Sequence, residues 1–356
     1  MSLRGEIAEQ PEVAERLLRT QRDHVAEIAA ALGSRPIDGV MIAARGSSDH
    51  AAIYAQYVFG ALHRLPVALA APSLVTVYET PPRMQNWLAI GISQSGRAPD
   101  VVGVIEAARS QGAPTLAITN DPASELAQMA DHAIDLSAGP ERAVAATKTY
   151  TSELLVLAML ASAMTSTETD APAWAGSRHS RLAALDAVPA ALGAALDAEA
   201  DAERAAHDRA HVEQCVVLGR GFEYATAREW ALKLKELCQM GADPYSAADF
   251  QHGPLSLVEP GYHVLAIATS GRTAAGVVAL LRRLRDDHGV DLLVISDDAE
   301  TRALGTASLA VPAGLPEWLA PIASIVPAQL FAYHITRAKG LDPEHPRWIS
   351  KVTLTH

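Results

Sequence analysis

The sequence repeats itself once, and this duplication limits the folds open to the chain more than any other feature. Three pairs of segments match in the same order: 39–52 with 215–227, 87–108 with 263–284, and 114–121 with 291–298. The offset is 175 residues from Arg45 to Arg220 and 177 from Ile118 to Ile295. Two unrelated domains could share a strand-like composition, but three matches at nearly one offset would not be expected of them. The sequence therefore predicts two copies of one domain.

Each copy alternates short apolar runs with amphipathic stretches. The runs include VMIAA, LAIGI and TLAIT, and such continuous apolar runs are typical of strands buried on both faces of a parallel sheet. Stretches such as PDVVGVIEAARSQG indicate helices that end at a glycine. The alternation predicts two tandem doubly wound, three-layer α/β/α domains with parallel sheets. Ligands of such sheets bind at the carboxyl ends of the strands.

The segments outside the two copies are expected to be largely helical. Apolar residues at helical spacing predict a helix within 7–33, and 316–339 is typical of one long helix. The ends of the copies then divide the chain into a helical segment at 1–36, a first α/β domain at 37–165, a linker with helices at 166–211, a second α/β domain at 212–340 and a tail at 341–356.

Charge and composition exclude several classes of function. The 356 residues carry a formal net charge of −12, and a surface of that sign repels nucleic acids and anionic membranes. One phosphate group can still be bound, because backbone amides and hydroxyls need no net positive charge. Cys215 and Cys238 are too few for a disulfide framework, and the longest apolar run, Leu154–Met164, is too short to span a bilayer. Since acidic residues also replace the apolar run of a signal peptide, we expect a soluble cytoplasmic protein.

Two turns rich in glycine and serine follow expected strands of the first copy. They are Gly46-Ser47-Ser48 and Ser93-Gln94-Ser95. Each offers backbone N–H groups near a helix start and hydroxyl donors, which is the chemistry that holds a phosphate. Either turn alone could merely cap a helix, but two at corresponding strand ends favour a ligand. The patterns G-x-G-x-x-G and G-x-x-x-x-G-K-[ST] are missing, so we expect no nucleotide cofactor.

A candidate acid–base helix lies in the second copy. Glu229, Lys233 and Glu236 are spaced i, i+4 and i+7, so they share one helix face, and His252 follows on a turn before Gly-Pro. A solvated helix face and a structural histidine are the alternative interpretation. The position of the helix after the Gly219–Gly221 turn, near an expected crevice, favours proton transfer instead. None of the 13 histidines has an H-E-x-x-H spacing, so no metal site is expected.

At these residues the sequence resembles a known family. It carries the motifs ARGSSDHAA, SQSG, AGPERAVAATKTYT, LGRGFEYATAREWALKLKE, QHGPLSLV and AYHITRAKG. Together these motifs cover nearly the whole chain and resemble the double sugar-isomerase (SIS) domain proteins. The resemblance is to the isomerase half of glucosamine-6-phosphate synthase and to its stand-alone relatives, the amino-sugar-phosphate deaminases and fructosamine-6-phosphate deglycases.

The resemblance implies a role for each matching position. The phosphosugar site maps to the two serine turns, with Val144 and Thr147 nearby. The glutamate that moves the proton maps to Glu236, on the helix that carries Glu229 and Lys233. The histidine that opens the sugar ring maps to His252, which in the family reaches into the partner's site across a homodimer. The lysine that meets the open-chain sugar maps to Lys351 in the tail.

Some positions depart from the family pattern. The glutamate and threonine that usually follow SQSG are Arg97 and Ala98, which removes one phosphate-facing hydroxyl. Trp230 replaces a small residue, and Trp348 stands where the family has asparagine, so bulky side chains are expected to reshape the sugar pocket.

The predicted reaction is the release of ammonia from an amino-sugar 6-phosphate such as glucosamine 6-phosphate, giving a ketose phosphate. Two alternatives stay open: a deglycase of fructosyl-amine phosphates, and a sugar-phosphate sensor without enzymatic activity. Residue 2 is serine where the synthase has its glutaminase cysteine, so no glutaminase domain is expected. The expected ligand is one small phosphorylated sugar, and the expected assembly is a homodimer.

Overall fold

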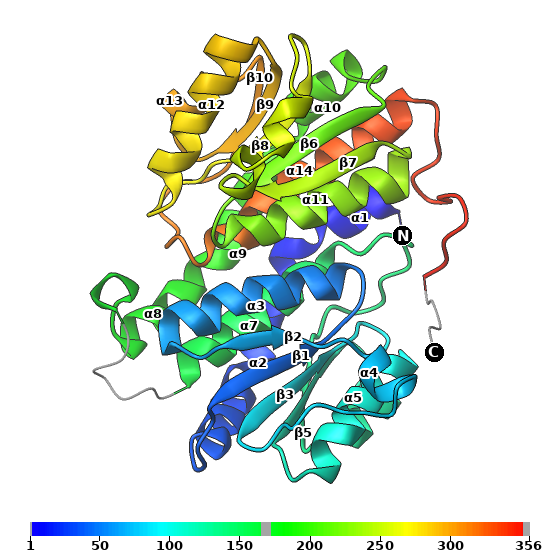
Figure 1. The fold of residues 1–356 in the computed structure, drawn as a ribbon, viewed down its shortest axis with the longest axis vertical. Coiled ribbons are helices and arrows are strands. Elements are labelled where there is room, and N and C mark those ends of the chain that lie inside the picture. The colour runs from blue at the N-terminus through cyan, green and yellow to red at the C-terminus, as the bar shows by residue number, and fades with distance from the viewer. Residues whose placement is uncertain (1, 165–171, 352–356) are drawn as a thin grey trace. The chain divides into compact units, whose positions relative to one another are not determined.

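The computed structural model describes residues 2–164 and 172–351, and the chain forms two compact units (Figure 1). The first-copy unit consists of Glu12–Glu141, Lys148–Asp186 and the chain from Ser350 onward. The second-copy unit consists of the residues up to Pro11, Arg142–Thr147 and Ala187–Ile349. Each unit contains one sheet, and the chain passes between the units more than once.

The sheet of the first-copy unit is fully parallel. Its strands are β1 (Gly39–Ala43), β2 (Val67–Leu69), β3 (Trp87–Ile92), β4 (Thr115–Thr119) and β5 (His132–Asp135). Their order across the sheet is β2-β1-β3-β4-β5. β1 pairs with β3 from Gly39 opposite Trp87 to Ala43 opposite Gly91, so the two strands finish side by side.

The sheet of the second-copy unit has the same topology. Its strands are β6 (Gln214–Gly219), β7 (Gly241–Ser246), β8 (His263–Ile267), β9 (Asp291–Ser296) and β10 (Ala307–Ala310). They are all parallel and lie in the order β10-β9-β8-β6-β7, which matches the first sheet strand for strand. Even the register agrees, because Val40 lies opposite Leu88 and Val216 opposite Val264, 48 residues apart in both pairs. The predicted duplication and the doubly wound α/β/α fold are confirmed.

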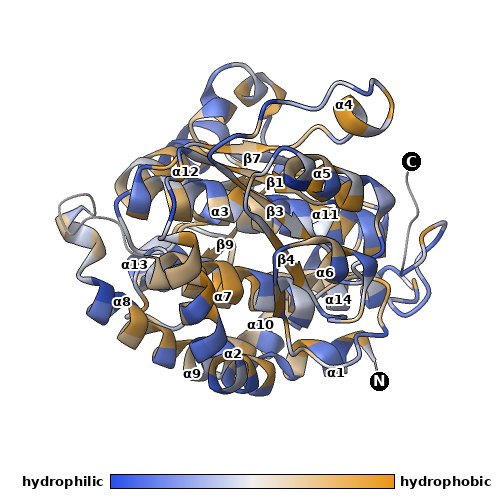
Figure 2. Cartoon of the chain, turned by 90° about the horizontal axis from the view of Figure 1, so that it is seen from below, coloured by the Kyte–Doolittle hydropathy of each residue, from blue (hydrophilic) through white to orange (hydrophobic). Residues whose placement is uncertain are grey.

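Helices cover both faces of the first sheet, with α3 on one face and α5 on the other (Figure 1). The helices of this unit are α2 (Gln10–Leu32), which begins two residues before it, α3 (Ser47–His63), α4 (Ser73–Thr76), α5 (Pro99–Ser110), α6 (Glu125–Met129), α7 (Lys148–Ala163), α8 (Arg178–Ala184) and the short η1 (Ala173–Ala175) and η2 (Leu185–Ala187). Val101 and Ile105 of α5 pack in the core with Ala89 of β3. Every residue of α7 is buried, although its first six residues are polar or aromatic and only the rest of the helix is mostly apolar (Figure 2).

The second sheet is covered in the same way, by α11 and α14 on one face and α12 on the other (Figure 1). The helices of this unit are α1 (Leu3–Ala8), α9 (Val188–Ala195), α10 (Glu199–Asp208), α11 (Glu223–Cys238), α12 (Ala274–His288), α13 (Ala299–Arg302), α14 (Ala320–Ala338) and the short η3 (Leu196–Ala198), η4 (Asp249–Gln251) and η5 (Pro254–Leu257). Within the described residues, no helix combines the length and the apolar character that crossing a bilayer requires.

Two helix predictions need correction. The helix expected within 7–33 is α2, which begins at Gln10 and not at residue 7, because Ile7 and Ala8 belong to the separate helix α1, which ends before Glu9. Pro11 explains the break, because proline has no N–H and fits only the first turn of a helix. The helix expected from residue 316 begins at Ala320, with Pro321 in its first turn for the same reason. The division of the chain at 36, 165, 211 and 340 stays a prediction.

Gly219 allows α11 to start directly after β6. A Cβ atom at this position would lie 2.3 Å from the backbone oxygen of Glu223 and 3.0 Å from the Cβ of Ala227. We expect Gly219→Ala to lower the free energy of unfolding by about 1–3 kcal/mol, as overpacking does. Gly193→Ala is the matched control, because nothing lies within 4 Å of its new methyl group in α9. It should raise stability by up to about 1 kcal/mol. Denaturant unfolding of both variants measures the difference, and equal effects would contradict this account.

Candidate active site

The two serine turns of the first copy lie at the point where the strand order of the sheet reverses. Ser47 and Ser48 begin α3 after β1, and Ser93-Gln94-Ser95 follows β3, the neighbour of β1. In doubly wound sheets this switch point is where ligands bind, because the connections leave in opposite directions and open a crevice. Gly46 precedes α3 with a φ of +56°, a conformation that favours glycine.

In the second turn the serine hydroxyls accept hydrogen bonds from the backbone. Ser93 Oγ accepts from the N–H of Gly96 at 3.2 Å, and Ser95 Oγ accepts from the N–H of Arg97 at 3.3 Å. Each hydroxyl hydrogen is therefore available to a ligand. Ser93 is buried, whereas Gln94 and Ser95 are half-buried. The turn can donate hydrogen bonds to an anion.

Ser48 is engaged differently. Its hydroxyl donates to Oε1 of Glu153, 2.8 Å away, and both residues are buried. Because that hydrogen is used, the Ser48 oxygen offers lone pairs to a ligand and suits a hydroxyl or an amine better than a phosphate. Sequence reasoning missed Glu153. The available signal was one acidic residue within the apolar stretch 149–164.

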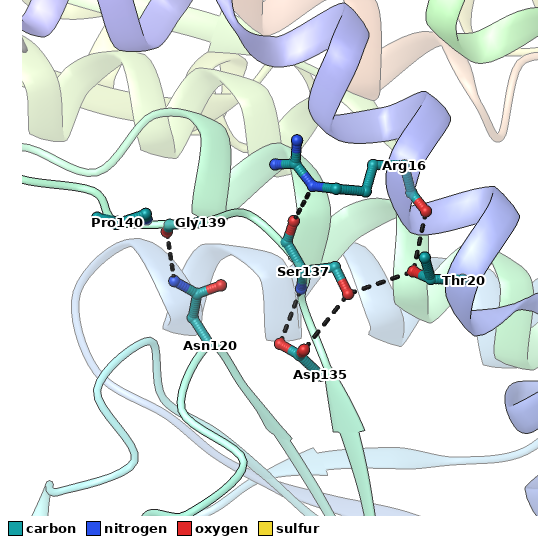
Figure 3. Close-up of a pocket in the computed structure, with 7 residues that line it drawn as sticks. All are labelled: Arg16, Thr20, Asn120, Asp135, Ser137, Gly139 and Pro140. Atoms are coloured by element: carbon teal, nitrogen blue, oxygen red, sulfur yellow. Dashed lines mark hydrogen bonds between the residues drawn. The ribbon is translucent and has the colours of Figure 1, made fainter.

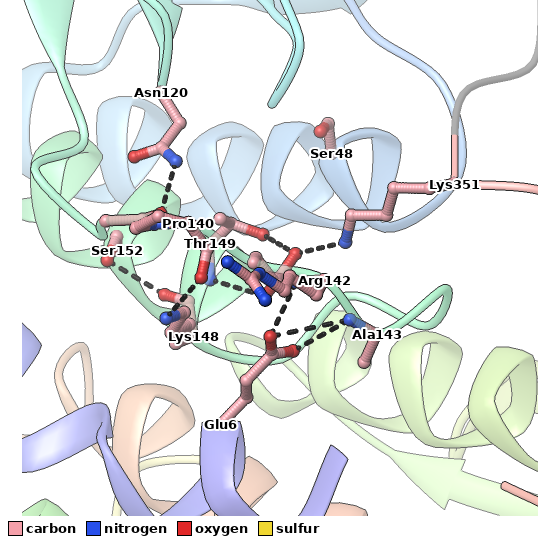
Figure 4. Close-up of polar contacts among 12 residues, drawn as sticks. Glu6, Ser48, Asn120, Pro140, Arg142, Ala143, Lys148, Thr149, Ser152 and Lys351 are labelled. Atoms are coloured by element: carbon pink, nitrogen blue, oxygen red, sulfur yellow. Dashed lines mark hydrogen bonds and ion pairs between the residues drawn. The ribbon is translucent and has the colours of Figure 1, made fainter. Parts of the chain in front are cut away.

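Val144 and Thr147 lie in the connection between β5 and α7. Val144 is half-buried and Thr147 is buried. The start of their segment is held by Glu6 of α1, a fully buried carboxylate that accepts from the N–H groups of Arg142 at 2.6 Å and Ala143 at 3.2 Å (Figure 4). Sequence reasoning missed Glu6, because its partners lie 136 and 137 residues away.

Glu229, Lys233 and Glu236 of α11 form a network of two ion pairs centred on Lys233. Lys233 Nζ lies 3.3 Å from Oε1 of Glu229 and 2.5 Å from Oε2 of Glu236. The Glu229 and Lys233 side chains are 0% and 2% exposed, whereas Glu236 is 23% exposed. Burial alone would lower the pKa of the Lys233 ammonium, but the two carboxylates outweigh burial and hold that pKa above its usual value. The shared face is confirmed, and Glu236 is its accessible end.

Glu236 lies at the end of α11 that is far from the crevice of its own copy. Glu236 lies in the last turn of α11, whereas Glu223 lies in the first turn, at the strand end. At 1.5 Å per residue the two positions are about 20 Å apart along the helix axis. His252 is exposed and directly follows η4. The roles of both residues therefore rest on the resemblance.

Lys351 is held by a buried carboxylate of the first-copy unit. Its Nζ lies 2.5 Å from Oε2 of Glu141, whose side chain is 0% exposed (Figure 4). Glu141 was not predicted, although it directly follows Gly139-Pro140 in the AGPE motif. The first-copy unit thus contains Ser48, Ser93, Gln94, Ser95 and Lys351, and the second-copy unit contains Val144, Thr147, Glu229, Lys233, Glu236 and His252.

An open pocket of about 540 Å³ also lies in the first-copy unit (Figure 3). It is lined by Arg16, Thr20, Asn120, Asp135, Ser137, Gly139 and Pro140. These groups largely bind one another: Arg16 donates to the Ser137 carbonyl at 2.8 Å, and Asn120 donates to the Gly139 carbonyl at 2.8 Å. None of the predicted site residues lines this pocket.

With this geometry established, comparison with known proteins identifies the family. A family model described as "SIS domain" matches residues 37–163 and again residues 210–337. The chain belongs to the SIS-domain family. The two matches fall on the two copies, so the duplicated unit is the SIS domain itself.

Known relatives align with almost the whole length of this chain. Glutamine–fructose-6-phosphate aminotransferase [isomerizing] from Pyrococcus horikoshii is 31% identical over 349 residues, 98% of this chain. The chain spans about half of that relative, 54% of its length. A Silicibacter pomeroyi protein assigned by name as a phosphosugar isomerase is 34% identical, with a TM-score of 0.83 over 96% of this chain and 99% of that chain. The C-terminal domain of glucosamine-fructose-6-phosphate aminotransferase from Francisella tularensis is 26% identical, with a TM-score of 0.85 over 96% of both chains.

The second SIS domain has carboxylates at the turns where the first SIS domain has serines. Glu223 stands at the position of Ser48 and accepts hydrogen bonds from Thr226, Thr269 and Ser324 at 2.6, 2.8 and 2.7 Å. Burial raises the pKa of Glu223, and the three hydroxyls only partly oppose this effect.

The turn after β8 corresponds to Ser93–Ala98. Its backbone N–H groups are bound by carboxylates of the same chain. Glu317 accepts from the N–H of Arg272 at 2.8 Å, and Asp297 accepts from the N–H of Ser270 at 2.7 Å. A Cβ atom on Gly271 would lie 2.4 Å from the carboxyl carbon of Glu317. An anion would therefore meet negative charge and backbone donors that are already bound. This is the physical reason for expecting phosphate at the first SIS domain only.

Removing Lys233 would leave a buried carboxylate without its cation. We expect Lys233→Met to lower the free energy of unfolding by about 3–5 kcal/mol, the usual cost of breaking a buried ion pair. The double variant Glu229→Gln, Lys233→Met should recover most of the loss, because only the partly exposed Glu236 carboxylate is then left next to position 233. Denaturant unfolding near neutral pH measures both variants. A double variant as unstable as the single one would show that packing, and not charge, explains the effect.

Proposed function

We propose that this SIS-domain chain is a phosphosugar isomerase that acts on an amino-sugar 6-phosphate and releases ammonia, leaving a ketose phosphate. The observation that carries the proposal is the pair of donor-rich turns at the switch point of the first SIS domain. The Pyrococcus relative is named for isomerisation and amino transfer on fructose 6-phosphate, which supports the substrate class. The deamination direction and the exact sugar are part of the proposal.

Binding of the phosphate is assigned to the turn after β3. Ser93 and Ser95 have hydroxyl hydrogens to donate, and an anion accepts them without any lysine or arginine. The Ser48 hydroxyl donates to Glu153, so the Ser48 oxygen is assigned to accept a hydrogen bond from a sugar hydroxyl or from the amine. Gly46, Ser47, Gln94, Val144 and Thr147 complete the proposed binding residues.

The chemical step moves one proton between adjacent carbons. In the proposed sequence His252 opens the ring, and the Glu236 carboxylate takes the proton from C2 and returns it to C1. As one proton also passes from the amine nitrogen to O1, the C–N bond at C2 becomes an imine, and addition of water to C2 then expels ammonia. Lys233, with its raised pKa, keeps a fixed positive charge at Glu236, and Glu229 holds Lys233 in place. Lys351 is assigned to the open-chain oxygen.

Ammonia release from glucosamine 6-phosphate tests the reaction and separates the roles of two residue groups. Glu236→Gln should lower kcat by about 10²–10⁴-fold, the usual contribution of general acid–base catalysis, and leave KM nearly unchanged. The matched variant Ser93→Ala, Ser95→Ala should act mainly on KM, because each lost charge-assisted hydrogen bond costs about 1.5–3 kcal/mol of binding. Release of an amine only from fructosyl-amine phosphates would favour the deglycase. Sugar-phosphate binding without any amine release would favour the sensor.

We also propose that the chain acts as a homodimer in which His252 completes the partner's site. The exposure of His252 on its turn supports this proposal. Chains with Glu236→Ala and chains with His252→Ala should each be inactive, and mixing them should restore part of the activity through hybrid dimers with one intact site. If subunit exchange occurs and no activity returns, the site is built within a single chain.

A further inference from the structure

Glu141 holds two segments that are far apart in the sequence. Its Oε1 accepts from the backbone N–H of Thr149 at 3.1 Å, and its Oε2 accepts from the Thr149 hydroxyl at 2.8 Å. The same Oε2 binds Lys351 Nζ at 2.5 Å, across 210 residues of sequence. Figure 4 shows Thr149 of α7 and Lys351 of the tail within one group of polar contacts.

The carboxylate is anchored without help from the tail. Thr149 belongs to the first turn of α7, where unpaired backbone N–H groups and the helix dipole favour a negative charge. The side chain of Glu141 is 0% exposed, so its position is set by the protein interior. A buried carboxylate that is already oriented is a strong acceptor for a lysine ammonium.

Another described contact of the tail lies upstream of Lys351, where Glu344 accepts from the N–H of Leu3 at 2.9 Å. After α14 the described part of the tail contains no helix or strand, and Trp348 is 99% exposed. Lys351, by contrast, is only 23% exposed at its side chain. Lys351 is therefore partly buried at the point where its ammonium meets Glu141.

The same face of α7 also holds Ser48. Thr149 and Glu153 are four residues apart, so they lie on one helix face about 6 Å apart along the axis. Thr149 donates to Glu141, which also binds Lys351, and the Ser48 hydroxyl donates to Glu153. This one helix face brings the tail lysine to within about one turn of the switch-point crevice.

We propose that Glu141 is a positioning residue that docks Lys351 beside Ser48 at the phosphosugar crevice. The docking follows from the contacts of Glu141 with Thr149 and Lys351. Its catalytic consequence rests on the proposed function, because Lys351 there meets the open-chain sugar.

Acetylation of lysines, read by mass spectrometry on the full-length protein, tests the docking without any activity. In Glu141→Gln the rate at Lys351 should rise by about tenfold or more relative to wild type, the factor that corresponds to one charge-assisted hydrogen bond. Lys339 is the internal reference, because its Nζ binds the Val212 carbonyl and Glu213 and not Glu141. An unchanged ratio of Lys351 to Lys339 in a folded Glu141→Gln protein would overturn the proposal.

Two further variants separate docking from general damage. Thr149→Val removes the hydroxyl that donates to Glu141 but keeps the Glu141 carboxylate, so Lys351 should stay protected from acetylation. Glu141→Asp should restore part of the protection, even if Glu141→Gln proves too unstable to measure. Equal exposure of Lys351 in Thr149→Val and in the Glu141 variants would mean that the start of α7, and not the charge, holds the tail.

Turnover adds a second readout once ammonia release is established. Glu141→Gln and Lys351→Met should lower kcat by similar factors, with little change in KM, and the double variant should be no slower than Lys351→Met. Additive losses would show that Glu141 acts on something other than Lys351. Loss of protection at Lys351 without any measurable turnover in wild type would uphold the docking and reject the proposed function.

Discussion

The parallel pairing of β1 with β3 is the contact on which the candidate site depends. Because Ala43 lies opposite Gly91, both strands end at the same level, and the turns that begin with Gly46 and Ser93 become neighbours. β2 lies outside β1 and β4 lies outside β3, so the connections diverge and leave the crevice between them. The pairing itself comes from apolar strands that are buried on both faces, and not from the serines.

The second SIS domain shows how far the same frame can change its chemistry. β6 and β8 pair in the register of β1 and β3, yet Glu223 stands in place of Ser48. A hydroxyl in this position can serve a ligand, whereas a carboxylate needs donors from the protein. Thr226, Thr269 and Ser324 supply these donors, so the crevice is filled by the chain itself. The two copies share the fold, and single residues give their turns a different polar chemistry.

Buried carboxylates have a recurring role in this chain. Glu6, Glu141 and Glu153 are each buried, and each accepts hydrogen bonds from a segment that has no regular structure or that begins a helix. Burying such groups is costly unless they are paired, so each one fixes its partners firmly. The net charge of −12 is therefore compatible with an anionic ligand, because some of the negative charge is already engaged inside the protein.

The sequence by itself determined the features that depend on neighbours along the chain. The duplication, the parallel sheets and the serine turns follow from apolar runs, helical spacing and turn residues. The shared face of Glu229, Lys233 and Glu236 follows from helix geometry. Tertiary structure alone decided that Ser48 meets Glu153 across 105 residues and that Lys351 meets Glu141 across 210. The physical reason is that a buried charge is paired by whichever donors packing brings to it, and those donors leave no periodic signal in the sequence.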